Sequence, residues 1–241
     1  MKEDGIRLNK YLAMCGVCSR RDADRIISEG KVCINGQMAT MGMRVEAGAI
    51  VTVNGKYVQA QSDKVVLAFY KPVGVVCTER DKYADKTILE YVKYPVRVTY
   101  AGRLDKDSEG LILLTNDGDL IEHMMRGANR HEKEYVVKVN KEITAEFINK
   151  MRNGIYLKEL EKTTRKCEVE KLGKYTFRIV LTQGMNRQIR RMCEALDYKV
   201  VGLKRIRIMN IMLDDLKVGE YRELSGEETK QLYTLAGLLA K

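Results

Sequence analysis

The order of apolar runs restricts the possible folds of this 241-residue chain more than any other feature. From residue 65 onward, strand-like and helix-like runs are mixed without the regular strand–helix–strand alternation of a parallel sheet. The strand-like runs are VVLAFYKP, VRVTYAG, LILLTN, KEYVVKV and YTFRIVL, and the helix-like runs are TAEFINKMRNG, NRQIRRMCEAL and EETKQLYTLAGLLA. Strands outnumber helices and hairpin-like connections are frequent. We therefore expect an α+β fold with a mainly antiparallel sheet flanked by helices.

The first 60 residues show a different pattern, with shorter elements. A helix is predicted over residues 7–14, and Ser19 has the N-cap pattern of a second helix that ends at Gly30. Two dipeptides then favour tight hairpin turns between short strands, Asn35-Gly36 and Asn54-Gly55. The polar stretch at residues 59–64 reads as a linker. We therefore expect two domains, at residues 1–60 and 65–241.

Charge indicates the kind of partner. Lys and Arg number 43 against 33 Asp and Glu, a net charge of +10, while 45% of the residues are hydrophobic. A folded, basic chain of this kind favours a polyanionic partner, although a merely solvated basic surface is the alternative. Four cations crowd the second predicted helix and its exit, as a phosphate-contacting surface would require: Arg20, Arg21, Arg25 and Lys31.

Several classes of protein are not supported by the sequence. No apolar run approaches the roughly 18 residues that span a bilayer, and no signal-peptide core follows the first residues, so we expect a cytoplasmic protein with no membrane partner. The six cysteines are scattered, which fits reduced thiols better than a disulfide framework. Cys15 and Cys18 have the spacing of half a zinc site, but no second pair completes it. We expect no bound metal.

One polar turn stands out between two apolar runs. The stretch AGRLDKDSEGLILLTNDGDL places Asp105, Asp107 and Glu109 within five residues, with Arg103 just before them. The pattern superficially follows a calcium-binding loop, but Glu109 replaces the Asp or Asn required at the fifth position, and Asn116 stands where the bidentate Glu should be. The remaining alternatives are a solvated turn, whose polar residues serve only backbone geometry, and a functional carboxylate.

A second arginine cluster lies far downstream in a helix-like run. Its apolar stripe consists of Ile189, Met192, Cys193 and Leu196. Arg187 and Arg191 then point away from this stripe, whereas Arg190 lies nearest its edge. An arginine at the edge of a buried stripe requires a carboxylate or another acceptor. The pattern alone does not identify that partner.

The first region resembles a known RNA-binding module. The segment RLNKYLAMCGVCSRRDADRIISEGKVCINGQ is similar to the S4 domain of ribosomal protein S4 and of several RNA-modifying enzymes. The resemblance implies RNA binding by residues 1–60. It also implies that Cys15 and Cys18 are packing residues between two helices.

The second region resembles the RNA pseudouridine synthases. GRLDKDSEGLILLTNDG, KEY and NRQIRRM are similar to three motifs of this family, in the branch that modifies ribosomal RNA and carries an S4 domain. The resemblance implies that Asp105 is the catalytic aspartate, that Arg190 pairs with it, and that Tyr135 stacks on the target base. It further implies that Arg103 fills the gap left by the extruded uridine. We add Arg187 to the expected RNA-binding residues.

The resemblance also implies the substrate and the absence of a cofactor. HEKEY, GMNRQIRRMCE and the RIRIMN…VGEYREL ending are most similar to branch members that act on 23S ribosomal RNA. We therefore expect a pseudouridine synthase domain at residues 65–241 that acts on a structured stem-loop of 23S RNA as a monomer. Lys71-Pro72-Val-Gly74 matches a further family segment, although a strand-ending turn explains it equally well.

Two other functions are compatible with parts of the sequence. A catalytically silent S4-type RNA-binding or ribosome-associated protein would explain residues 1–60 and the charge, but not three catalytic motifs together. A hydrolase that cleaves the glycosidic bond would need a second carboxylate, which Asp107 or Glu109 could supply. We expect instead that these two acids only shape or solvate the turn.

Overall fold

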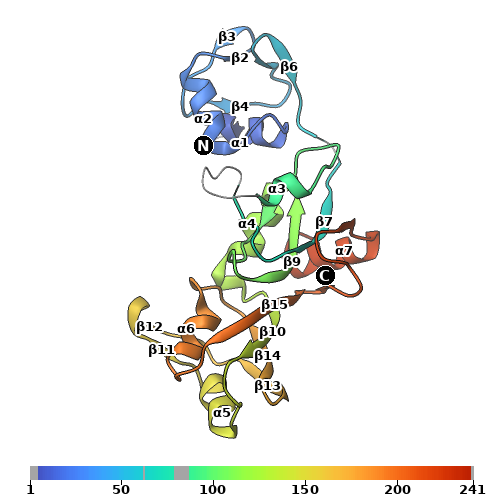
Figure 1. Ribbon diagram of the computed structural model, residues 1–241. Coiled ribbons are helices and arrows are strands. Elements are labelled where there is room, and N and C mark those ends of the chain that lie inside the picture. Colours follow the sequence, from blue (N-terminus) through green and yellow to red (C-terminus); the bar gives the residue numbers. More distant parts are fainter. Residues whose placement is uncertain (1–4, 62, 79–86, 240–241) are drawn as a thin grey trace. The chain divides into compact units, whose positions relative to one another are not determined.

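The computed structural model describes residues 5–61, 63–78 and 87–239. The chain divides into two compact units (Figure 1). Unit 1 consists of Met1–Val65 together with two short later segments, Tyr94–Val98 and Asn116–Gly118. Unit 2 consists of Val66–Lys93, Thr99–Thr115 and Asp119–Lys241. Two pieces of the second sequence region therefore pack in the first unit.

Unit 1 contains two helices and a small antiparallel sheet. The side chain of Ser19 accepts a hydrogen bond from the backbone N–H of Asp22 at 3.2 Å, which confirms the predicted N-cap. Asn35 and Asn54 both have positive φ, as the predicted hairpin turns require. The helices are α1 (Leu8–Met14) and α2 (Arg20–Ser28). The sheet runs in the order β3 (Gln37–Met38), β2 (Val32–Ile34), β5 (Val51–Val53) and β6 (Lys56–Val58), and β1 (Ile6–Arg7) pairs with β4 (Arg44–Val45).

Unit 2 is built on a large mixed sheet. Its strand order is β13 (Glu168–Gly173), β14 (Thr176–Leu181), β10 (Lys133–Val139), β15 (Val200–Ile208), β9 (Glu109–Thr115), β7 (Val66–Lys71) and β17 (Tyr221–Glu223). In addition, β8 (Thr99–Ala101) pairs with β9, β16 (Ile211–Met212) pairs with β15, and β11 (Tyr156–Leu157) pairs with β12 (Lys162–Thr163). Every pairing among these named strands is antiparallel except that of β15 with β9. The predicted α+β class and mainly antiparallel sheet are confirmed.

Each helix of unit 2 buries apolar side chains. The α-helices are α3 (Ile88–Tyr91), α4 (Gly118–Met125), α5 (Ala145–Asn153), α6 (Gln188–Glu194) and α7 (Gly226–Leu235), and two 3₁₀ turns span Gly127–Asn129 and Lys158–Leu160. The helix predictions that became α5, α6 and α7 are confirmed, whereas α3 and α4 were not anticipated. No helix among the described residues is both long and apolar enough to cross a bilayer.

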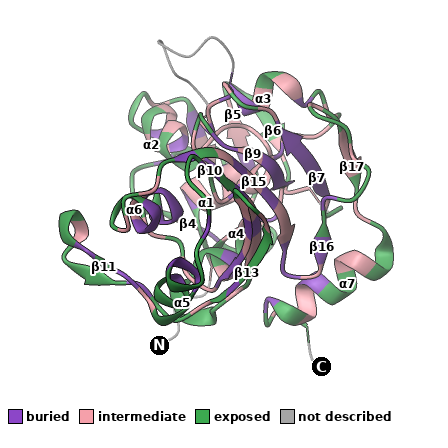
Figure 2. Cartoon of the chain, turned by 60° about the horizontal axis from the view of Figure 1, so that its bottom comes forward, coloured by how far each residue is buried: buried purple, intermediate pink, exposed green. Residues whose placement is uncertain are grey.

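The central strands of the sheet are buried on both faces. All residues of β7 are buried, and β9 is buried after its first residue (Figure 2). One face carries Tyr70 and Leu111, which belong to a core cluster with Leu120 of α4 and Leu232 of α7. The other face carries Phe69, whose ring packs against Tyr91 of α3. This rigid centre fixes the strand ends that carry the polar turn.

Candidate active site

The connection at residues 102–108 contains the acidic turn, residues 105–108, and lies where β8 and β15 separate along the same edge of β9. The end of β9 pairs with β8, from Leu113 to Thr115, whereas its first two residues pair with β15. The connection between β8 and β9 therefore lies next to the end of β9 that pairs with β15. The backbone N–H of Ser108 donates to the carbonyl of Asp105 at 3.1 Å and closes the turn. Asp105 is about one third exposed, with a side-chain accessibility of 32%.

Two neighbouring segments hold this turn. The backbone N–H of Leu104 donates to Sγ of Cys77 at 3.4 Å, and that of Gly74 donates to the carbonyl of Lys106 at 2.7 Å. Lys71 is fully buried, and its Nζ donates to the carbonyls of Pro72 and Val75 at 2.8 and 2.9 Å. The segment Lys71–Gly74 is thus more than a strand-ending turn, because it supports the acidic turn directly.

Arg187 binds both aspartates of the turn. Its guanidinium forms a two-pronged pair with Asp107, at 3.1 and 3.3 Å, and lies 3.6 Å from the carboxylate of Asp105. The periodicity placed Arg187 within the helix. In the structure it is instead the N-cap residue that precedes α6, with φ of 50°. Partial burial would raise the pKa of Asp107, but the hydrogen bond from Arg187 and the charge of Arg190 outweigh it and lower that pKa.

Arg190 does not pair with Asp105, which corrects the expectation. Its Nη2 donates to the carbonyl of Asp107 at 2.9 Å and to Oγ of Ser108 at 3.3 Å, and lies 3.3 Å from the Asp107 carboxylate. Its Nη1 donates to the carbonyl of Val200 at 3.4 Å. Arg190 is only 8% exposed, and the groups of the turn that its guanidinium contacts are those of Asp107 and Ser108. The predicted need for an acceptor at this edge position is confirmed.

Tyr135 and the turn are connected through one row of the sheet. Tyr135 is paired with Arg205 on β15, Arg205 with Gly110 on β9, and Gly110 with Lys71 on β7. Directly paired residues share a face of a sheet, so Tyr135, Arg205 and Lys71 project to the same side. Tyr135 is 9% exposed. The row brings Tyr135 and the turn to the same part of the molecule, although 30 residues separate them in sequence.

The comparisons with known proteins agree with these features. The family model of RNA pseudouridylate synthase matches residues 65–195, and that of the S4 domain matches residues 6–51. The chain belongs to the RNA pseudouridine synthase family. It is 47% identical to the dual-specificity RNA pseudouridine synthase RluF of Escherichia coli (strain K12), over 98% of this chain and 81% of that protein. It is 37% identical to ribosomal large subunit pseudouridine synthase B of Bacillus subtilis (strain 168), over 95% of this chain and 96% of that protein.

A solved structure supports the same assignment. A crystal structure of a pseudouridylate synthase superposes with a TM-score of 0.70 at 29% sequence identity, over 94% of this chain and 99% of that one. The synthase described here is therefore an isomerase with an N-terminal S4 domain. Its described residues contain no cluster of three or more His, Cys, Asp or Glu side chains that could hold a metal ion.

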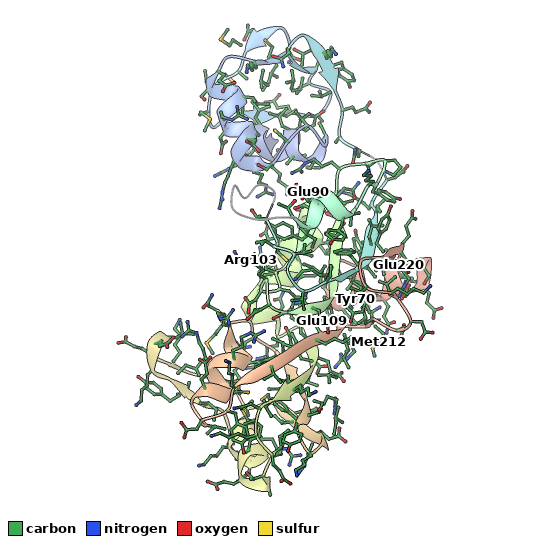
Figure 3. The ribbon with its side chains drawn as sticks, viewed as in Figure 1. Tyr70, Glu90, Arg103, Glu109, Met212 and Glu220 are labelled. Carbon is green, nitrogen blue, oxygen red and sulfur yellow. The ribbon has the colours of Figure 1, made fainter. Side chains whose placement is uncertain are left out.

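Glu109 and Arg103 of the synthase occupy different surroundings. Glu109 accepts a hydrogen bond from the hydroxyl of Tyr70 at 3.0 Å, and Lys204 lies 4.9 Å from the centre of the Tyr70 ring. Figure 3 shows Tyr70 and Glu109 next to each other, and Arg103 on the segment before the turn. Arg103 is exposed. The exposure of Arg103 leaves its side chain accessible to a large ligand.

The S4 domain of the synthase presents a basic hollow that the sequence only partly indicated. The hollow has a volume of about 320 Å³, and no acidic residue among those that the structure describes lines it. Its lining consists of Gly5, Ile6, Asn9 and four cations: Arg7, Lys10, Arg20 and Arg44. Two of the predicted RNA-binding residues are instead engaged with acids. Arg25 binds Asp22 and Glu29, both at 3.3 Å, and Lys31 binds Glu29 at 2.5 Å. Arg21 is exposed on α2.

The contacts of Asp107 revise its expected role, because it binds two arginines of the synthase and does more than solvate the turn. We expect Asp107→Ala to reduce single-turnover activity roughly tenfold and to destabilise the fold by about 1 to 3 kcal/mol, since Arg190 loses its carboxylate while it stays buried. Thermal unfolding and a rate measurement at saturating enzyme test this. Lys106→Ala, at the exposed neighbouring position, is the control. Equal behaviour of the two variants would contradict the role of Asp107.

Proposed function

We propose that this synthase converts a specific uridine of 23S ribosomal RNA to pseudouridine, with Asp105 as the catalytic carboxylate. The observation that carries the proposal is the turn itself. Asp105 is partly exposed, Arg187 lies 3.6 Å from its carboxylate, and the turn belongs to the part of the chain matched by the family model. The names of the relatives support a ribosomal substrate, since one of them is a ribosomal large subunit pseudouridine synthase.

The chemistry suits a single carboxylate without a cofactor. The bond between C1′ and N1 of uridine breaks, the uracil turns, and C5 forms a new bond to C1′. Asp105 serves this rearrangement either as a nucleophile at C1′ or as a base that removes the proton from C2′. The guanidinium of Arg187, 3.6 Å from this carboxylate, is placed to hold it in position.

The target base must leave its stack before this chemistry. Flipping a base costs a few kcal/mol, and least in a loop or bulge of the RNA. Arg103, exposed before the turn, is suited to fill the gap that the base leaves. Tyr135 offers an aromatic face, and stacking on such a face stabilises a base by roughly 1 to 3 kcal/mol.

The surroundings of the other two acids argue against glycosidic hydrolysis. A hydrolase of this kind needs a second carboxylate free to act beside the reacting carbon. Asp107 is bound by Arg187 and Arg190, and Glu109 by the hydroxyl of Tyr70. Isomerisation therefore fits these contacts better than hydrolysis. Nucleoside analysis separates the two reactions, because hydrolysis releases free uracil and isomerisation retains the base with a carbon–carbon link.

Chemical mapping of pseudouridines in ribosomal RNA tests the whole proposal. Cells with and without the protein would be compared, followed by reconstitution with purified protein on the RNA that contains the affected site. A uridine of 23S RNA that is modified only when the protein is present is the expected result. An unchanged pseudouridine pattern, together with no activity of the purified protein, would reject the proposal.

Substitution of Tyr135 tests base capture. We expect Tyr135→Phe to keep most RNA affinity, because the ring is retained, and to lower turnover if the hydroxyl takes part in proton movement. Tyr135→Ala should impair both base capture and turnover, since it removes the stacking face. Binding and single-turnover rates on the same RNA give the comparison. Near-wild-type rates for both variants would remove Tyr135 from the site.

The basic hollow of the S4 domain should contribute phosphate contacts to RNA binding. Arg20→Ala is expected to weaken RNA affinity several-fold and to reduce the slope of log Kd against log salt concentration by about 1, because one phosphate contact is lost. Arg25→Ala is the matched control, from the same helix and with the same change in charge. Its guanidinium already binds Asp22 and Glu29, so a smaller effect is expected. The reverse order of effects would place the RNA elsewhere on the domain.

A further inference from the structure

Two cations beside Tyr135 have no carboxylate partner in the part of the chain that the structure describes. Lys133 lies two residues before Tyr135 on β10, and Arg205 is the partner of Tyr135 on β15. Within the described residues, Lys133 donates only to the carbonyl of His131, at 3.4 Å. Arg205 is 2% exposed, and its Nε donates to the carbonyl of Leu111 at 2.7 Å. Nη2 of Arg205 is buried without a hydrogen-bond partner in that part of the chain.

The neighbouring arginine on the same strand shows that this is unusual. Arg207, two residues after Arg205, binds Glu134 at 2.7 Å and Glu132 at 3.0 Å. Among the described residues, the fold therefore places acids beside Arg207 but none beside Lys133 or Arg205. Burial, with the nearby charge of Arg205, lowers the pKa of Lys133 to about 8. Unpaired charge in such surroundings is costly, and an anion would relieve that cost.

The proposed reaction generates an anion on the base that is proposed to stack on Tyr135. If Asp105 attacks C1′, a bond from its carboxylate oxygen to C1′ forms as the C1′–N1 bond breaks. If Asp105 removes the C2′ proton, a C1′–C2′ double bond forms as the same bond breaks. In both routes the electron pair of the C1′–N1 bond leaves with the base. The detached uracil is thus an anion, with its charge shared between the ring and its carbonyl oxygens, until C5 bonds to C1′.

We propose that Lys133 and Arg205 form an anion subsite that binds the detached uracil beside Tyr135. Nζ of Lys133, which is only partly buried, donates to a carbonyl oxygen of the ring. Arg205, buried and anchored on Leu111, adds positive charge from behind and acts as a positioning residue. A backbone phosphate is the other possible source of an anionic oxygen. Its links to the RNA chain keep it nearer the protein surface than the buried Arg205, so the base is the better occupant. This assignment rests on the proposed function.

The test compares leaving groups. Lys133→Met and Lys138→Met remove the same charge from the same strand, and Lys138 is exposed. Single-turnover disappearance of the N1-linked target nucleoside would be measured on two RNAs, one with uridine and one with 5-fluorouridine at the target. Fluorine withdraws electrons and stabilises the uracil anion by itself. We expect Lys133→Met to slow the uridine reaction on the order of 100-fold and the 5-fluorouridine reaction only about tenfold. Lys138→Met should leave both rates near wild type.

Further variants separate the subsite from a structural role. Lys133→Met should be as thermally stable as wild type or more stable, because it removes an unpaired charge. Lys133→Arg should restore part of the rate, since it keeps the charge. Arg205→Gln is expected to show the same leaving-group dependence as Lys133→Met, at smaller size.

Each other outcome contradicts the subsite. Equal losses on the two RNAs would mean that Lys133 does not stabilise the leaving base. A loss in affinity and in salt dependence, with normal rates at saturation, would assign Lys133 to a phosphate. Unchanged affinity and rates would show that Lys133 is not part of the site. If the rate of Lys133→Met falls only in proportion to unfolded protein, and Lys133→Arg does not restore it, the role of Lys133 is structural. All of these outcomes require an active wild-type protein and concern the subsite alone. A wild-type protein that forms no pseudouridine in any RNA would instead overturn the proposed function.

Discussion

Asp105→Asn is expected to abolish turnover while folding and RNA binding survive. Asparagine is nearly isosteric with aspartate, and the side chain is only partly buried, so the turn should keep its shape. The amide is neither a nucleophile nor a useful base, and we expect the rate to fall by at least about 1,000-fold. Tritium release from RNA labelled at uridine C5 measures the rate, and a binding assay on the same RNA measures affinity.

Glu109→Gln is the matched control for this substitution. It makes the same chemical change four residues later, at a position whose side chain accepts a hydrogen bond from Tyr70, and an amide oxygen can still accept that bond. Substantial activity is therefore expected. Tritium release by Asp105→Asn close to the wild-type rate would show that the catalytic assignment is wrong. An inactive wild type would in addition favour a silent S4-type RNA-binding protein.

Gly110→Ala is expected to disrupt the site through the backbone rather than through a lost side chain. Gly110 has φ of +111°, and an added Cβ would lie 2.6 Å from the backbone nitrogen of Arg205 and closer still to its carbonyl oxygen. No rotamer change can relieve contacts between backbone atoms. We expect a loss of roughly 3 kcal/mol or more in the free energy of unfolding, from backbone strain and overpacking together. Denaturant unfolding measures it.

Gly219→Ala provides the comparison within the same unit. Gly219 also has positive φ, +84°, but its added Cβ would meet only the Tyr91 ring, at 3.7 Å. Backbone strain alone should cost about 1 kcal/mol there. Similar losses at the two glycines would show that the close approach of β9 and β15 does not limit stability. Full activity of Gly110→Ala would show that this approach is also unnecessary for the site.

For Arg190, the local sequence pattern predicted burial at the helix edge but not the identity of its partner. Periodicity placed Arg190 at the edge of the apolar stripe of α6, and the residue is indeed buried and bound to several acceptors. The identity of those acceptors came from the family resemblance, which gave Asp105, whereas the carboxylate bound is that of Asp107. More than 80 residues separate Arg190 from Asp107, and a local sequence pattern does not distinguish between two aspartates in the same turn.

The hollow of the S4 domain illustrates the same limit. The crowding of Arg20, Arg21 and Arg25 on one predicted helix was visible in the sequence, but charge counts do not show which cations acids already bind. The structure pairs Arg25 with Asp22 and Glu29 and leaves Arg20 lining the hollow. Arg7 and Arg44, from the strands β1 and β4, join it there. The short strand pair that brings them together gave no sequence signal.

The sequence by itself determined the features that depend on neighbours within a few residues. These are the cap at Ser19, the Asn-Gly turns, the α+β pattern and the acidic turn, because caps, turns and periodicity depend on local backbone geometry. Only the tertiary structure decided that β15 pairs with β9 and that Arg187 and Arg190 both bind Asp107. It also decided that Lys133 and Arg205 meet no acid among residues 5–61, 63–78 and 87–239. The basic residues of β15 do not resemble those of a central strand in the sequence. Their side chains become buried or paired only when distant segments pack on the strand.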